Sequence, residues 1–239
     1  MLSVSNLSKS FGAIVVADGS SFDVAEGDAL GVLGPNGAGK TSLFNLITGT
    51  LRADSGSLIF AGEDITGVSA AGRAKRGIAR SFQIPQPFSG MSVFENTLVG
   101  ASHGAGMSGA EAGEHCLDIL ARTGLIDHAN LTAGSLSLLQ RKRLELARAL
   151  AAKPKLLLLD EIAGGLTEAE CGALIETIQG IRKEGTTIIW IEHVVHALLA
   201  VVDRLMVIDF GKKIAEGAPD AIMASREVKE IYLGIDGDG

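Results

Sequence analysis

The sequence predicts an α/β fold in which helices cover a mostly parallel sheet. Between residues 156 and 209, short apolar runs typical of buried strands alternate with helical stretches. Strands that are separated by helices pair in parallel, with both faces of the sheet covered. Residues 1–60 instead combine strand patterns with turn residues, and residues 85–152 are mostly helical. We therefore expect an α/β core with a β-rich N-terminal part and a helical insertion.

Composition restricts the class of protein. The chain has 239 residues, 46% of them hydrophobic, and 21 basic against 28 acidic residues give a net charge of −7. This charge argues against a generic nucleic-acid binder, which needs a basic surface for phosphate contacts. No apolar run approaches the roughly 18–20 residues of a membrane-spanning helix, and residues 1–10 lack the pattern of a secretory signal. Cys116 and Cys171 show no metal-binding spacing, which favours a soluble protein of a reducing compartment over a disulfide scaffold.

The N-terminal part is expected to contain strands and turns. Strands are predicted at residues 2–7, 20–24 and 58–60, and turns at residues 17–21, 25–28 and 53–57. Within this part, residues 29–33 form an apolar strand that ends before a glycine, and residues 40–51 have a helical pattern.

The insertion and the C-terminal part follow in order. Helices are predicted at residues 92–101, 113–124 and 137–152, with a flexible loop at residues 102–109. Strands at residues 156–160, 187–191 and 205–209 then alternate with helices at residues 168–183 and 193–201. A short hairpin at residues 211–217 and a tail helix at residues 220–233 complete the predicted order.

Residues 34–41 match the phosphate-binding pattern G-x-x-x-x-G-K-[ST] at each fixed position, between a predicted strand and a predicted helix. The glycines let successive backbone N–H groups turn toward one point, which the positive end of the helix dipole also faces. Lys40 adds a charge for the β- and γ-phosphates, and Thr41 offers a hydroxyl to Mg²⁺. The sequence therefore predicts a nucleoside triphosphate site. The expected ligands are Gly34, Pro35, Asn36, Gly37, Ala38, Gly39, Lys40, Thr41 and Ser42.

A second motif supplies two carboxylates. The aliphatic run at residues 156–159 ends in Asp160 and Glu161, and a buried parallel strand presents its C-terminal residues where such sheets bind ligands. Asp160 would hold Mg²⁺, usually through water. Glu161 points to the opposite side of the strand and would polarise an attacking water as a general base.

The order of these motifs resembles that of the ATP-binding cassette (ABC) ATPases. After the phosphate loop come Gln83, the helix start Leu136-Ser137-Leu138-Leu139-Gln140-Arg141, the pair Asp160-Glu161, and Glu192-His193. The resemblance covers essentially the whole chain. It implies a single ABC ATPase domain over residues 1–239, with a helical subdomain at about 85–152 and a C-terminal tail helix at about 219–239. It also implies a P-loop NTPase core with a mostly parallel sheet and an N-terminal antiparallel β subdomain.

A narrower resemblance concerns three segments. Residues 160–168, the run Ile191-Glu192-His193 and the compact tail are similar to the ATP-binding subunits of branched-chain amino-acid-type uptake transporters. This similarity suggests the subfamily within the ABC ATPases.

The resemblance also assigns roles that the spacing alone does not explain. Phe11 matches the aromatic residue that stacks on adenine. Gln83 matches the glutamine that reaches Mg²⁺ and the attacking water, at the start of the segment that touches the membrane subunit, with Gln86 as a competing candidate. His193 matches the γ-phosphate histidine and, with Glu161, would be catalytic. The helix that begins at Ser137 matches the signature helix, which contacts the nucleotide bound by the opposite subunit, and Gln140 belongs to the same signature.

Two positions depart from the family's pattern. Leu138 and Leu139 replace both glycines of the usual signature Leu-Ser-Gly-Gly-Gln, and leucine side chains limit close approach of the backbone to phosphate. Thr167 stands where many members carry an aspartate that organises the subunit interface. Both changes imply altered contacts between two cassettes, while Ser137 keeps a helix N-cap role.

Other charged and titratable residues are given no catalytic role. The basic clusters at residues 73–76 with Arg80, and at residues 141–143, are expected to be solvated faces. The alternative is contact with a permease loop or with anionic lipid headgroups. The histidines expected to be structural or surface residues are His103, His115, His128 and His196.

Taken together, the resemblance implies an ATPase that uses ATP and Mg²⁺ to drive uptake of branched-chain or related amino acids. The expected partners are a second ATP-binding subunit (identical or related), integral membrane permeases and, indirectly, a solute-binding protein, but no nucleic acid. The expected location is cytoplasmic, peripheral on the inner face of the cell membrane. Two alternatives stay open: a soluble ABC ATPase that is not coupled to transport, and a non-hydrolysing, nucleotide-gated binding module.

Overall fold

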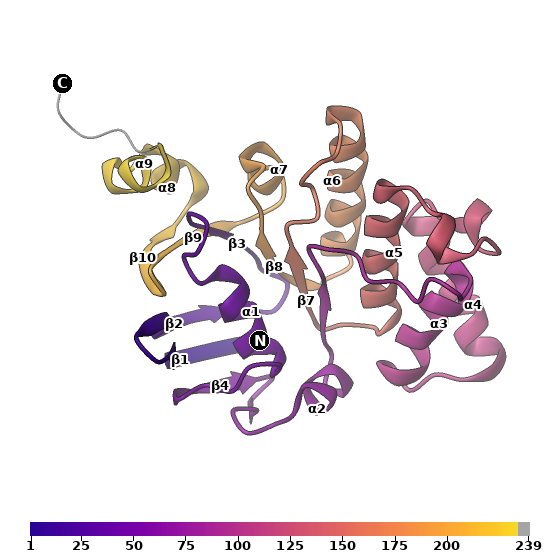
Figure 1. Ribbon diagram of the computed structural model, residues 1–239, viewed down its shortest axis with the longest axis horizontal. Helices are drawn as coiled ribbons and strands as arrows, with labels where there is room; N and C mark the ends of the chain where they lie inside the picture. The colour runs from indigo at the N-terminus through magenta and orange to yellow at the C-terminus, as the bar shows by residue number, and fades with distance from the viewer. Residues whose placement is uncertain (234–239) are drawn as a thin grey trace.

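The structure, a computed structural model, describes residues 1–233 and is built around a six-stranded sheet. The strands are β3 (Ala29–Leu33), β6 (Ile78–Ser81), β7 (Leu156–Asp160), β8 (Thr187–Ile191), β9 (Arg204–Asp209) and β10 (Lys212–Gly217). Their spatial order is β10-β9-β3-β8-β7-β6 (Figure 1). Neighbours are parallel except β9 and β10, which are antiparallel. The C-terminal ends of the parallel strands therefore gather at one edge of the sheet.

A second, antiparallel sheet packs against the first helix. Its strands, in spatial order, are β2 (Ile14–Val24), β1 (Leu2–Phe11), β4 (Ser55–Phe60) and β5 (Glu63–Asp64). The helix α1 (Lys40–Thr48) shares one hydrophobic cluster with both sheets, in which Phe44 packs with Phe22, Phe60 and Val32. Because α1 is held between the two sheets, its N-terminus and the preceding loop are fixed as well.

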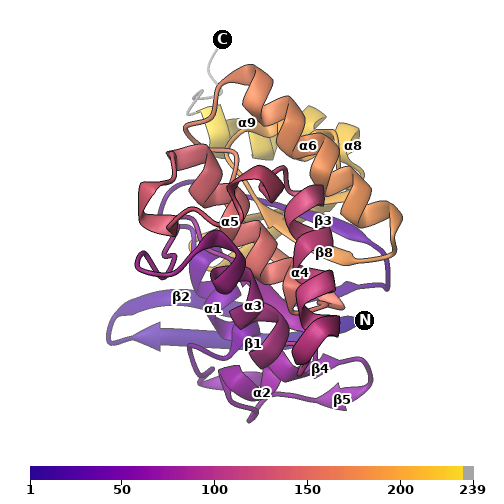
Figure 2. The same cartoon turned by 90° about the vertical axis from the view of Figure 1, so that its right-hand side faces the viewer.

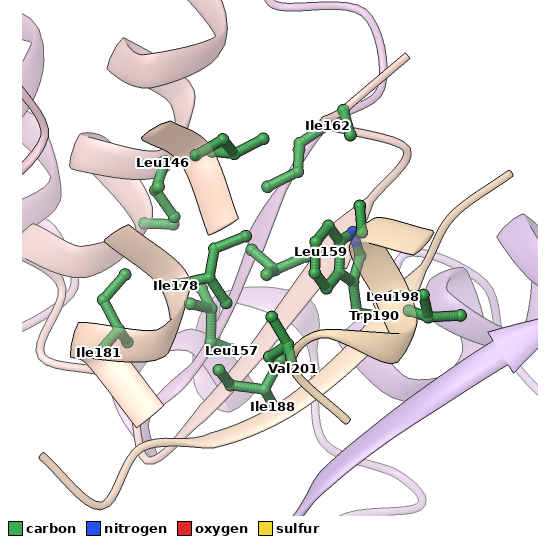
Figure 3. Close-up of a cluster of buried hydrophobic side chains, with 14 of the residues drawn as sticks. Leu146, Leu157, Leu159, Ile162, Ile178, Ile181, Ile188, Trp190, Leu198 and Val201 are labelled. Carbon is green, nitrogen blue, oxygen red and sulfur yellow. The ribbon is translucent and has the colours of Figure 1, made fainter. Parts of the chain in front are cut away.

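The other face of the central sheet is covered by helices. They are α6 (Glu168–Lys183), α7 (Val195–Leu199), α8 (Pro219–Ala224) and α9 (Arg226–Leu233). Figure 3 shows Ile178 of α6 among buried side chains that include Leu159 of β7 and Trp190 of β8. Leu158, which lies between Leu157 and Leu159 in β7, faces the other side of the sheet and belongs to the hydrophobic cluster around α1. Burial on both faces explains why these strands are continuous apolar runs in the sequence.

The helical insertion lies at one end of the molecule. Its helices are α3 (Val93–His103), α4 (Gly109–Arg122) and α5 (Leu138–Ala151), with 3-10 turns at Ile126–His128 and Ala133–Ser135. The three helices lie side by side in both views (Figures 1 and 2). Ser92 begins α3 with a capping box, in which its side chain and that of Glu95 satisfy each other's backbone N–H groups. The short helix α2 (Ala70–Lys75) precedes β6.

The predicted α/β fold class is confirmed, and the bounds of the strands at 29–33, 156–160 and 187–191 and of the helix at 168–183 are as expected. The turn predicted at residues 17–21 is wrong, because these residues lie inside β2. The β1–β2 pairing contains register shifts, and Gly19 has a φ of 61°, so turn-forming residues are accommodated inside a bulged strand.

The C-terminal tail differs in part from the expected single helix. Two short helices, α8 and α9, meet at Ser225, whose backbone is extended. The predicted tail helix also included residues 234–239, which lie outside the described residues. None of the helices within residues 1–233 combines the length and the apolar character that crossing a membrane requires.

Candidate active site

The phosphate-binding loop is packed so tightly that only glycine fits at two of its positions. The loop connects β3 to α1, at the C-terminal edge of the central sheet. A Cβ atom on Gly34 would lie 2.2 Å from the carbonyl oxygen of Ile208, and one on Gly39 would lie 2.3 Å from that of Val16. Gly39 also has a φ of 100°, in the left-handed region. The loop conformation is therefore set by close backbone contacts with β9 and β2.

The loop encloses one side of a cavity of about 360 Å³. Its other side is formed by Gln83, by Glu161 and by Val16 of β2. The predicted nucleotide ligands that line the cavity are Asn36, Gly37, Ala38, Gly39, Lys40, Thr41 and Ser42. The cavity thus brings together the phosphate loop, the predicted base and the predicted glutamine.

Lys40 is buried inside the loop. Its Nζ donates hydrogen bonds to the carbonyl oxygens of Gly34 and Pro35, at 2.7 and 3.0 Å. Burial lowers the pKa of Lys40, whereas the negative charges of Glu161 and Asp160 act to raise it. These contacts hold a cation beside the cavity, where phosphate oxygens could replace the loop carbonyls as acceptors.

The carboxylate of Glu161 lies between the two other residues predicted to act near the γ-phosphate. Gln83 Nε2 donates a hydrogen bond to Glu161 Oε2, and His193 Nε2 lies 2.7 Å from Glu161 Oε1. Glu161 has a φ of 48°, which is unusual for a residue other than glycine. The C-terminal ends of three neighbouring strands, β6, β7 and β8, bring these side chains together although they are far apart in the sequence.

Asp160 has one paired and one unpaired carboxylate oxygen. Oδ2 accepts a hydrogen bond from Arg80 Nη2 at 2.5 Å, whereas Oδ1 is buried and makes no hydrogen bond to the described residues. Burial raises the pKa of Asp160, and the hydrogen bond and charge of Arg80 oppose this shift. A buried oxygen without a donor suits a cation, so Asp160 fits a magnesium site that Thr41 and Gln83 would complete.

Magnesium does not require a large cluster of protein ligands here. No group of three or more His, Cys, Asp and Glu side chains within residues 1–233 could hold a metal ion. In nucleotide sites, however, Mg²⁺ is bound by one or two carboxylates together with substrate phosphates and water. A single carboxylate beside the phosphate loop is therefore compatible with Mg²⁺ bound together with a nucleotide.

Seven of the predicted site residues do not line the cavity: Phe11, Gly34, Pro35, Ser137, Gln140, Asp160 and His193. Phe11 is exposed at the end of β1, with Lys9 Nζ 5.2 Å from the centre of its ring. Ser137 and Gln140 form a capping box at the start of α5, and Gln140 Nε2 lies 2.8 Å from His128 Nε2. Leu138, next to Ser137, is half exposed. The start of α5 thus presents polar and apolar groups to solvent, away from the cavity of its own chain.

The expectation that both basic clusters are solvated faces is wrong for three residues. Arg73 is buried and donates to carbonyl oxygens that include those of Leu46 and Ile47, at the C-terminal end of α1. The side chain of Arg80 is 6% exposed and contacts Asp160. Lys142 is also buried. Each of these cations has a partner at least 22 positions away in the sequence, so composition alone gives no signal for their burial.

Comparisons with known proteins agree with the motif order. The profile of the ABC transporter family matches residues 17–164, more than half of the chain, and one described as branched-chain amino acid ATP-binding cassette transporter matches residues 212–238. The chain is 35% identical to BraF, a high-affinity branched-chain amino acid transport ATP-binding protein of Pseudomonas aeruginosa, over 98% of both chains. It is 33% identical to LivG of Escherichia coli, which has the same description, also over 98% of both chains.

The fold agrees as well. The crystal structure of the ADP conformation of MJ1267, an ATP-binding cassette of an ABC transporter, matches with a TM-score of 0.89 at 33% identity over 98% of both chains. The family and the fold class expected from the sequence are thereby confirmed. The chain belongs to the ABC transporter family, as an ATPase similar to the ATP-binding subunits of its branched-chain amino acid transporters.

Proposed function

We propose that this chain is the ATP-binding subunit of an importer and hydrolyses ATP at the interface of two cassettes. Hydrolysis would drive uptake of branched-chain or related amino acids through separate permease subunits. The observation that carries the ATPase part is the convergence of Gln83 and His193 on Glu161 beside the phosphate loop. The substrate class is supported by the names of the relatives and by the match of residues 212–238.

In this proposal Glu161 is the general base. A carboxylate can take a proton from water as the water attacks the γ-phosphate of ATP. Gln83 and His193 would orient that carboxylate and then contact the water and the γ-phosphate. Lys40 and the loop N–H groups would stabilise the charge that develops on the phosphate oxygens. Mg²⁺, held by Thr41, Gln83 and Asp160, would neutralise phosphate charge when it is bound.

A second cassette is part of the proposal because the signature residues lie apart from the cavity. Ser137 and Gln140 are absent from its lining, and they begin a helix whose N-terminus carries a partial positive charge. In this proposal, that end of α5 binds a phosphate of the nucleotide held by another subunit. ATP would then bridge two cassettes, and its hydrolysis would release them.

A groove between the core and the helical insertion would receive the permease. Its volume is about 250 Å³, and Arg80, Phe82, Glu145 and Arg148 are among the residues that line it. The segment at residues 82–88, which contains Gln83, exposes the apolar side chains of Phe82, Ile84 and Phe88. Exposed apolar side chains that occur close together are typical of an interaction surface. The subunit would thus be held at the inner face of the cell membrane by its partners.

Reconstitution tests the whole proposal. The cassette, together with permeases and a solute-binding protein from neighbouring open reading frames, is placed in proteoliposomes, and uptake of radiolabelled leucine is measured with ATP inside. We expect ATP-dependent uptake that disappears in Glu161→Gln. ATP hydrolysis that is independent of any permease and drives no uptake of amino acids would favour the uncoupled ATPase. Nucleotide binding without turnover in the wild type would favour the non-hydrolysing module.

A further inference from the structure

Two buried charged side chains, Lys142 and Glu192, lie next to the predicted catalytic residues without entering the nucleotide cavity. Lys142 is 7% exposed and Glu192 is 1% exposed, and neither lines the cavity. Burial raises the pKa of Glu192 and lowers that of Lys142, and each charge opposes the shift of the other. Ionised groups at such depth are costly unless hydrogen bonds compensate them.

Lys142 connects the helical insertion to the segment that follows β7. It lies in the second turn of α5. Its Nζ donates a hydrogen bond to the carbonyl oxygen of Gly164 and lies 3.5 Å from that of Glu161. Both carbonyl groups belong to residues 161–164, which have no regular helix or strand structure.

Glu192 directly follows β8 and is hydrogen-bonded to the same segment, residues 161–164. Its Oε2 accepts the backbone N–H of Ala163 at 2.8 Å. Its Oε1 accepts the N–H groups of His193 at 3.0 Å and of Val194 at 3.4 Å. One carboxylate therefore links the loop that carries Glu161 to the loop that carries His193.

The segment at residues 161–165 needs such support. Glu161 has a φ of 48°, a left-handed conformation that is strained for a glutamate, and Gly165 has a φ of 76°. The N–H of Glu161 donates to the carbonyl oxygen of Ile191 at 2.8 Å, while its carbonyl faces Lys142. Strained backbone of this kind persists only where its surroundings fix it from several sides.

We propose that Lys142 and Glu192 form a clamp that positions Glu161 and His193 for hydrolysis. The clamp acts through backbone atoms, so both are positioning residues, and the proposal rests on the roles given above to Glu161 and His193. The phosphate loop makes no contact with the clamp among the hydrogen bonds of the described residues. Loss of the clamp should therefore lower kcat and leave the KM for ATP nearly unchanged.

Three variants distinguish a role of the clamp in positioning Glu161 and His193 from a contribution to protein stability alone. Lys142→Met and Glu192→Gln each leave one buried charge without its counterpart, so both should lower Tm. The double variant removes both charges and should regain most of the lost Tm. We expect kcat to stay about 10- to 100-fold low in all three, with KM within about twofold of wild type. Lys142→Arg keeps a charged donor and should retain more of kcat than Lys142→Met.

Hydrogen exchange of the nucleotide-free protein tests the contacts directly. In wild type, the amides of Ala163 and His193 donate to Glu192 and should exchange slowly. In Glu192→Gln and in the double variant, one side-chain oxygen of residue 192 is replaced by an N–H₂ group, which donates a hydrogen bond and does not accept one. Hydrogen exchange at the backbone N–H of Ala163, of His193 or of both should then be at least about tenfold faster. Lys183→Met and Glu176→Gln, on the exposed side of α6, are the matched controls and should change neither kcat nor exchange.

Two results would overturn the clamp. One is a double variant whose kcat recovers together with Tm, because that recovery would make the pair purely structural. The other is unchanged exchange at Ala163 and His193 in both Glu192 variants, which would show that the carboxylate does not hold these amides. If instead Glu161→Gln keeps normal turnover, the proposed role of Glu161 fails, and the exchange experiment still decides on the clamp.

Discussion

His193 Nε2 lies 2.7 Å from Glu161 Oε1, so the histidine after β8 already contacts the predicted base at the end of β7. Gln83 occupies the other oxygen of the same carboxylate. In the proposed function, both polar side chains would contact the attacking water or the γ-phosphate once ATP is bound. The arrangement holds the carboxylate at the edge of the cavity before substrate binds.

The first prediction concerns Glu161. Glu161→Gln keeps the size of the side chain, but an amide cannot accept a proton from water, so turnover should fall at least ~100-fold. ATP affinity should be kept because the phosphate loop is unaltered. Turnover is measured by phosphate release and affinity by calorimetry, with Glu176→Gln on α6 as the control. Unchanged turnover would remove Glu161 from the mechanism.

The second prediction concerns two glycines of the phosphate loop. Gly39 and Gly37 both have positive φ values, 100° and 82°, so alanine at either position should cost roughly 1–2 kcal/mol. A Cβ on Gly39 would also lie 2.3 Å from Val16 O, whereas one on Gly37 would have no heavy atom within 4 Å. Gly39→Ala should therefore destabilise the protein by at least ~1 kcal/mol more than Gly37→Ala.

Denaturant unfolding without nucleotide measures this difference. The two variants share the cost of the left-handed backbone, so their difference isolates the steric contact with β2. Equal losses of stability would mean that β2 moves away at little cost, and that the close contact does not define the loop.

Burial on both faces of the central sheet produces a sequence pattern from which strands can be predicted. Strands β7 and β8 are continuous apolar runs because each of their faces is covered. The bulged strand β2 was missed in part, because its register shifts place turn-forming residues such as Gly19 in a strand. Helix α1 ends at Thr48, before the predicted end, because Gly49 adopts a left-handed conformation there.

The candidate site was predictable only where local motifs carry the chemistry. The phosphate loop and the pair Asp160-Glu161 are each contiguous in the sequence. The neighbours that support them are not: Arg80 reaches Asp160 across 80 positions, and Glu192 reaches the N–H of Ala163 across 29. Such contacts depend on which strands are adjacent in the sheet, and local motifs and periodicity do not specify that order.

The third prediction concerns the buried pair of Arg80 and Asp160. Their side chains are 6% and 1% exposed, and Arg80 also donates to Asn45 Oδ1 at 2.6 Å. Arg80→Met would leave Asp160 buried and unpaired, which should cost about 3–5 kcal/mol in the free energy of unfolding. In Arg80→Met/Asp160→Asn the uncompensated charge is gone, so much of this stability should return.

Denaturant unfolding without nucleotide or metal measures both variants. Arg76→Met, which removes an exposed ion pair to Glu63, is the matched control and should cost less than ~1 kcal/mol. A loss in Arg80→Met no larger than that of the control would mean that the pair of Arg80 and Asp160 contributes no more than a surface ion pair.

The fourth prediction concerns the pH dependence of stability at Glu145. This carboxylate is buried in the groove, where it accepts hydrogen bonds from the N–H of Gln86 and from Arg148 Nη1 at 2.9 and 2.8 Å. Burial raises its pKa above the ordinary value of 4.5, although Arg148 and the N–H of Gln86 oppose the shift. Between 4.5 and that raised value, the folded protein keeps a proton that the unfolded chain has lost.

Stability must therefore fall as pH rises through this window, and the loss is complete above the folded-state pKa. Glu145→Gln removes the titrating group, so its free energy of unfolding should decrease less than that of wild type between pH 4.5 and about pH 7.5. The variant loses the charge opposite Arg148 as well, so the slope with pH, and not the absolute stability, is the diagnostic quantity. Urea unfolding at a series of pH values measures that slope, and Glu114→Gln on α4 controls for the loss of one carboxylate from an exposed site. A slope equal to that of wild type would mean that Glu145 is ionised in both states over this range, with Arg148 and Gln86 compensating fully for its burial.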